Sequence, residues 1–87
     1  MIPKVRIYTS PWCPDCRRAK YFLKEHKIPF EEIDIEQVPG AADFVIAANE
    51  GKRRLPTFET GSRTFHCSPY DPQKLSFEFK VLPTGTK

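Results

Sequence analysis

The alternation of apolar and polar residues predicts short strands and helices in mixed order along the chain. Val5 to Tyr8 is an apolar, β-branched and aromatic run, which favours a buried strand followed by a loop. From Cys13 to about Lys27 the period changes to three and four residues, which predicts a helix. Its buried face is expected to comprise Cys16, Ala19, Phe22, Leu23 and His26. Pro29 ends this helix, because the residue before a proline is pushed out of the helical region.

A second strand and a second helix are predicted next. Phe30 to Asp34 is predicted to be a strand, because Ile33 and Ile35 alternate with acidic residues from Glu32 to Glu36, which is typical of a strand with one buried face. Pro39 and Gly40 then open a helix, and Gly51 is expected to follow its end at the C′ position. The apolar face of this helix is expected to comprise Ala41, Phe44, Val45 and Ala48.

A hairpin and a third helix complete the predicted elements. Thr57 to Thr60 and Thr64 to His66 bracket a Gly-Ser pair, which indicates two antiparallel strands. Asp71 followed by Pro72 predicts an N-cap and the first residue of a helix. The face of this helix is expected to comprise Leu75, Phe79 and Leu82. Residues 83–87 are expected to form a flexible tail.

The predicted order, β-α-β-α-β-β-α, defines an α/β fold with a four-stranded mixed sheet flanked by helices. The length of 87 residues predicts a single domain over 1–87. The net charge of +3 is mild, and most basic residues alternate with acidic ones, so nucleic acid is not an expected partner. No apolar run is long enough to span a membrane, and no secretory signal is evident at the N-terminus. We therefore expect a cytoplasmic monomer.

The motif Cys13-Pro14-Asp15-Cys16 lies where the first predicted loop enters the first helix. Only about 3% of a free thiol is ionised at neutral pH, but unpaired N–H groups and partial positive charge at a helix start favour a thiolate. We therefore expect Cys13 to be the nucleophile and Cys16, inside the first turn, to be the resolving cysteine. The carboxylate of Asp15 opposes a second negative charge at Cys13. Arg17 and Arg18 counter that effect if they reach back toward Cys13. The sequence therefore leaves open whether these charges together favour or oppose a thiolate at Cys13.

Two other interpretations of the cysteines compete with the redox one. Cys13 and Cys16 are half of a zinc site if His66 and Cys67 complete it, although neighbouring strand residues point to opposite sides. The pair is otherwise structural and inert. Cys67 is itself either a small buried hydrophobe or an additional redox thiol.

Two segments resemble the glutaredoxin branch of the thioredoxin fold, and within it the NrdH-type redoxins. The segment from Tyr8 to Cys16 is similar to the active-site segment of that family. Lys52 to Phe58 is similar to the basic residues and the X-Pro pair that precede the third strand. The resemblance implies that Pro56 follows a cis peptide bond and faces the cysteines. It also implies that the backbone of Leu55 pairs with a bound disulfide peptide.

The resemblance implies a thiol–disulfide oxidoreductase that reduces protein or glutathione mixed disulfides through the Cys-Pro-Asp-Cys motif. No bound cofactor is expected, and electrons come from glutathione or from thioredoxin reductase and NADPH. Ser68 to Leu75 resembles the NrdH type more than a glutathione-binding segment. The alternative function is a binding module that holds zinc or an iron–sulfur cluster. The residues expected to bind substrate are Trp12, Pro14, Arg54, Leu55, Pro56 and Ser68.

Overall fold

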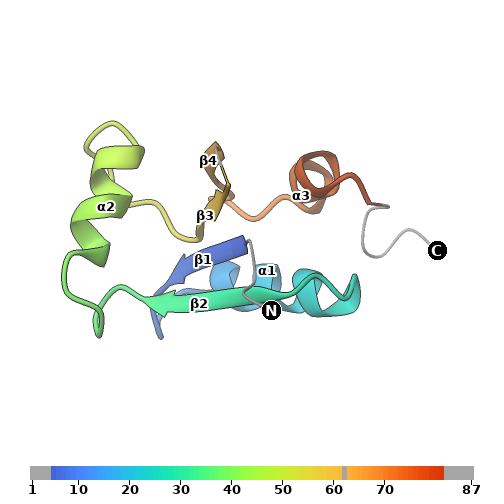
Figure 1. Cartoon of the computed structure of the whole chain (residues 1–87), viewed down its shortest axis with the longest axis horizontal. Helices are drawn as coiled ribbons and strands as arrows, with labels where there is room; N and C mark the ends of the chain where they lie inside the picture. The colour runs from blue at the N-terminus through green and yellow to red at the C-terminus, as the bar shows by residue number, and fades with distance from the viewer. Residues whose placement is uncertain (1–4, 62, 82–87) are drawn as a thin grey trace.

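The computed structural model describes residues 5–61 and 63–81, and its elements follow the predicted order (Figure 1). These elements are β1 (Val5–Thr9), α1 (Pro14–Glu25), β2 (Phe30–Asp34), α2 (Ala41–Ala48), β3 (Thr57–Thr60), β4 (Arg63–His66) and α3 (Pro72–Phe79). The strands form one sheet in the order β2-β1-β3-β4. β1 is parallel to β2, while the β1–β3 and β3–β4 pairs are antiparallel, which confirms the predicted mixed sheet. Within the described residues, no helix is long and apolar enough to cross a membrane.

The sheet separates two hydrophobic clusters because the side chains of β1 point alternately to its two faces. Val5 and Ile7 pack in one cluster with residues of α1, β3 and α3, namely Ala19, Phe22, Leu23, Phe58 and Leu75. Tyr8 packs in the other cluster with Ala41 and Val45 of α2. α1 and α3 therefore cover one face of the sheet, and α2 covers the other. Figure 1 shows α2 and α3 at opposite ends of the molecule, with β3 and β4 between them.

The predicted face of α1 is confirmed, but the helix is shorter than predicted. Its buried residues are Cys16, Ala19, Phe22 and Leu23, whereas His26 is half-buried at the C-cap. The helix ends at Glu25 because Lys27 takes a left-handed conformation, with φ 56°. The N–H of Ile28 then bonds to the carbonyl of Leu23 at 2.9 Å, which closes the last turn before Pro29 is reached.

Two predictions for α2 are wrong at its C-terminal end. Ala48 is exposed rather than part of the buried face, and Asn49 is buried instead. Gly51 does not occupy the C′ position, because Glu50 takes the left-handed conformation there, with φ 58°. Gly51 is one residue further on, and its N–H bonds to the carbonyl of Ile46 at 2.8 Å.

The predicted start of α3 is confirmed. The carboxylate of Asp71 accepts hydrogen bonds from two N–H groups of the first turn, at 3.0 and 3.4 Å. Leu75 is fully buried, and Phe79 packs against the same cluster. Leu82 and the predicted tail over 83–87 lie outside the described residues.

Asn49 ties the end of α2 to the segment that leads into β3. Its side-chain N–H₂ donates to the carbonyl of Val45 at 2.8 Å and to the hydroxyl of Thr57 at 3.0 Å. The Thr57 hydroxyl in turn donates to the carbonyl of Arg54 at 2.6 Å, and this threonine is fully buried. These bonds hold residues 54–57 in place against α2.

Asn49→Ala is expected to lower the free energy of unfolding by about 1–3 kcal/mol, because it removes buried hydrogen bonds and leaves acceptors unpaired. Urea unfolding measures this change. Glu50→Gln, on the exposed side of the same turn, is the control and is expected to change stability by less than about 0.5 kcal/mol. Equal losses in the two variants would contradict the structural role given to Asn49.

Candidate active site

Cys13 is the N-cap of α1, and its sulfur takes the place that an oxygen occupies in most helix caps. The backbone of Cys13 is extended, with φ −104° and ψ 104°, and Pro14 is the first helical residue. The Sγ atom accepts a hydrogen bond from the N–H of Cys16 at 3.0 Å. The N–H of Cys13 bonds to the carbonyl of Ser10 at 3.3 Å, which closes the turn between β1 and the helix. The loop therefore directs this thiol at the unpaired N–H groups of the first turn.

The segment before β3 lies against Cys13. The Sγ atom is 3.7 Å from the carbonyl oxygen of Leu55, within hydrogen-bond distance for a thiol donor. The Leu55–Pro56 peptide bond is cis, as the resemblance implied. Pro56 is buried, whereas Cys13 is partly exposed. Residues far apart in the sequence thus form one site around a single accessible thiol.

Cys16 differs from Cys13 in its surroundings. Its side chain is only 1% exposed. Burial raises the pKa of the Cys16 thiol, and the hydrogen bond with Cys13 raises it further. The backbone at Ser10 and the positive charge of Lys20 act in the opposite direction. Cys16 is therefore protonated at neutral pH and shielded from solvent.

A cavity of about 330 Å³ opens beside both cysteines and extends to β2. In its wall, the Glu32 carboxylate accepts hydrogen bonds from Thr9 at 2.8 Å and Lys20 at 2.9 Å. Burial alone would raise the pKa of Glu32, but these two hydrogen bonds lower it on balance. Lys20 was not among the residues expected at the site, although its position four residues after Cys16 places both on one helix face.

The charges near the helix start are arranged around Asp15. Of the two arginines expected to reach back, Arg18 does so, and its guanidinium lies 3.2 Å from the Asp15 carboxylate. Arg17 instead lines the cavity beside the cysteines. Because Asp15 is paired with a cation, its negative charge is partly compensated at the first turn of α1.

The other residues expected to bind substrate lie at varied positions. Trp12 is 81% exposed. Pro14 is exposed at the helix start. Arg54 lines a different cavity, on the far side of the Leu55–Pro56 segment from Cys13. Ser68 is half-buried, and its N–H bonds to Nδ1 of His66 at 3.3 Å.

Cys67 is a buried member of the core shared by α1 and α3. Its N–H bonds to the carbonyl of Pro56 at 3.0 Å, and its sulfur accepts the N–H of Asp71 at 3.1 Å. Burial raises the pKa of its thiol. This environment agrees with the interpretation of Cys67 as a small hydrophobe. Among the described residues, no three His, Cys, Asp or Glu side chains gather as metal ligands, so the zinc set with His66 is not assembled.

The fold and the paired cysteines define a protein of the thioredoxin-like class. The structure is similar to that of a glutaredoxin from Archaeoglobus fulgidus, with a TM-score of 0.74 and 25% identity over 90% of this chain and 87% of that one. It also resembles the Escherichia coli NrdH-redoxin, described as glutaredoxin-like, with a TM-score of 0.63 and 31% identity over 71% and 79% of the chains. The glutaredoxin family model matches residues 5–64, and the chain belongs to the glutaredoxin family.

Curated relatives agree with this assignment. A protein of Mycobacterium tuberculosis (strain CDC 1551 / Oshkosh) that carries the name glutaredoxin is 45% identical over 58 residues, which are 64% of this chain and 69% of that protein. The global transcriptional regulator Spx of Listeria innocua is 34% identical over 83 residues, which are 91% of this chain. The chain spans 56% of the length of that regulator.

Iodoacetamide is expected to label the native reduced protein at Cys13 first, because the other two thiols are buried and their pKa values are raised. Mass spectrometry should show one label at short times and three after denaturation. Cys13→Ser is the control and should abolish the fast label. Labelling of Cys16 or Cys67 at the rate of Cys13 would contradict the arrangement described above.

Proposed function

We propose that the chain is a dithiol thiol–disulfide oxidoreductase that reduces protein or glutathione mixed disulfides. The observation that carries this proposal is the contrast between two thiols one helical turn apart. Cys13 is accessible and its sulfur accepts an N–H at the helix start, whereas Cys16 is buried behind it. This contrast supports Cys13 as the thiol that attacks an incoming disulfide, and Cys16 as the thiol that then attacks the sulfur of Cys13.

The reaction proceeds through two exchanges. The Cys13 thiolate attacks one sulfur of the substrate disulfide, so that a mixed disulfide forms and the other substrate sulfur leaves as a thiolate. Cys16 then loses its proton and attacks the sulfur of Cys13, which releases the second substrate thiolate. The substrate gains two electrons, and Cys13 and Cys16 become a disulfide. An external dithiol or two thiol molecules then return those electrons to the protein.

The Leu55–Pro56 segment supports binding of an extended substrate peptide. The carbonyl of Leu55 lies beside the Cys13 sulfur, so a peptide attached to that sulfur can pair with the Leu55 backbone. Trp12 and Pro14, the exposed chain neighbours of Cys13, offer apolar contact to a partner protein. Arg54 and Ser68 follow from the resemblance, and they would contact substrate groups further from the reacting sulfurs.

We infer that the protein works as a monomer in the reducing cytoplasm, without a bound cofactor. Two electron donors fit: glutathione, or a thioredoxin reductase supplied with NADPH. The carboxylate of Asp71, in the segment that resembles the NrdH type, is engaged as the cap of α3. Offering each donor separately to the oxidised protein distinguishes them. The metal content and colour of freshly purified protein test the alternative of a zinc or iron–sulfur module.

Cys16→Ser is expected to trap a mixed disulfide between Cys13 and a disulfide substrate, because the second exchange lacks its nucleophile. Non-reducing gels and mass spectrometry detect the adduct, and a reducing agent should release it. Cys67→Ser is the matched control, since it removes another buried thiol and should leave turnover intact. An absence of the adduct, or equal trapping in both variants, would refute the proposed mechanism.

Release of substrate from the mixed disulfide is expected to accelerate as the pH rises. The pKa of Cys16 lies above that of an ordinary thiol because of burial, so its thiolate fraction still increases where an ordinary thiol is fully ionised. Single-turnover release measured between about pH 6 and about pH 10 checks this prediction. A plateau at or below the pKa of a free thiol would contradict it.

A further inference from the structure

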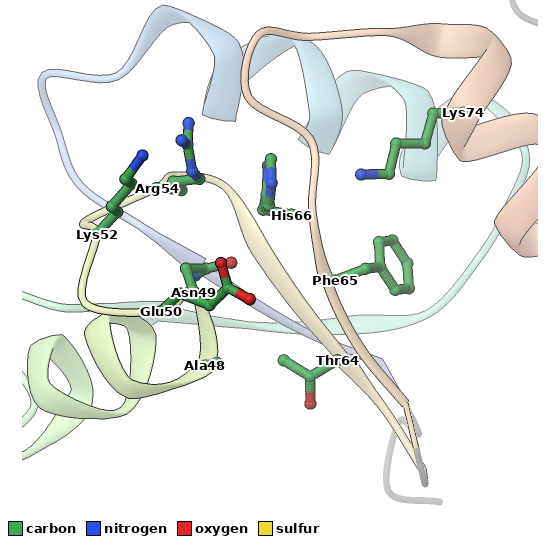
Figure 2. A pocket seen from close by; sticks show the side chains of 9 residues that line it. All are labelled: Ala48, Asn49, Glu50, Lys52, Arg54, Thr64, Phe65, His66 and Lys74. Atoms are coloured by element: carbon green, nitrogen blue, oxygen red, sulfur yellow. The ribbon is translucent and has the colours of Figure 1, made fainter.

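A second cavity, of about 390 Å³, is lined by residues from the end of α2, the segment that follows it, the edge strand β4 and α3. Figure 2 shows Lys52 and Arg54 on one side of it, His66 in the middle and Lys74 pointing in from α3. Glu50 also lines it, and neither active-site cysteine does. The cavity therefore gathers positive charge from three separate parts of the chain outside the redox site.

The basic run from Lys52 to Arg54 divides between two sides of the segment. Lys52 and Arg54 line the cavity, whereas the guanidinium of Arg53 lies 4.0 Å from the Glu36 carboxylate. Within residues 5–61 and 63–81, no carboxylate lies within ion-pair distance of Lys52, Arg54 or Lys74.

His66 adds a hydrogen-bond donor at the centre of the cavity. Its Nδ1 accepts the N–H of Ser68 at 3.3 Å, so the ring proton is assigned to Nε2. Burial lowers the pKa of His66, and the positive charges of Lys74 and Arg54 lower it further. The charges of Lys74 and Arg54 thus both act on the His66 imidazole, as expected if the two side chains border the same cavity.

We propose that this cavity binds the terminal phosphate of a small phosphorylated molecule. Three cations and an imidazole N–H line the cavity, and a single carboxylate would balance only one of the three positive charges. A phosphate monoester offers three acceptor oxygens and nearly two negative charges, and it matches this set. The cavity volume is within the range of small-molecule sites, so it also accommodates an organic group attached to the phosphate.

Glu50 contributes a negative charge to the cavity. Its removal therefore tests whether the cavity binds an anion. Its carboxylate faces the same space as the cations, and a phosphate placed there is repelled by it. Glu50→Gln is accordingly expected to strengthen phosphate binding, whereas loss of any lining cation weakens it.

The probe is inorganic phosphate, titrated into the reduced protein at constant ionic strength while amide NMR shifts are followed. Saturable shifts are expected at Lys52, His66 and Lys74. Arg54→Gln should weaken binding by about tenfold, as loss of a charge-assisted hydrogen bond implies. Arg53→Gln, which removes an equal charge from the opposite side of the segment, should change it by less than about twofold.

Several outcomes would overturn this proposal: shifts spread over the whole surface, equal effects of the two arginine variants, acetate binding as tightly as phosphate, or weaker binding in Glu50→Gln. Lys74→Gln is the second variant if Arg54→Gln fails to fold, and it should also weaken binding. The titration is repeated with Cys13→Ser, which cannot carry out thiol exchange. Phosphate binding in that variant shows that the cavity acts independently of the redox function.

Discussion

The hydrogen bond between the Cys13 sulfur and the Cys16 N–H is the constraint on which the site depends. A helix start needs an acceptor at its N-cap, and this chain supplies a sulfur there. The bond fixes the sulfur over the first turn, and the turn through Ser10 connects that position to the end of β1. The parallel β1–β2 pair and the helix that joins them therefore hold one thiol beyond the C-terminal end of β1.

The same helix turn makes the two thiols unequal. Cys13 lies at the N-cap, next to the loop. Cys16 lies three residues further along the chain, on the buried face of α1 with Ala19 and Phe22. Burial disfavours the charged form of Cys16, while Lys20, one turn further on, favours it. Lys20 is itself held by Glu32 of β2, so the contrast between the two thiols depends on packing between α1 and the sheet.

Local signals in the sequence were sufficient for the element order, the face of α1 and the Asp71 cap, because each depends on residues within one or two turns. Predictions failed where a distant partner decides the outcome. Asn49 replaces Ala48 on the buried side of α2 because its amide reaches Thr57 on β3, a contact that no helical period reveals. The Glu32–Lys20 pair likewise depends on how β2 is aligned with β1.

The segment from Lys52 to Thr57 connects the two cavities, because neighbouring residues of it contact each of them. The carbonyl of Leu55 faces Cys13, while Arg54, its neighbour, faces the cationic cavity. The hydrogen bond from Thr57 to the Arg54 carbonyl fixes both at once. A change that moves this segment would therefore alter the redox site and the cavity together, whereas a change of one side-chain charge would affect only the side that it faces.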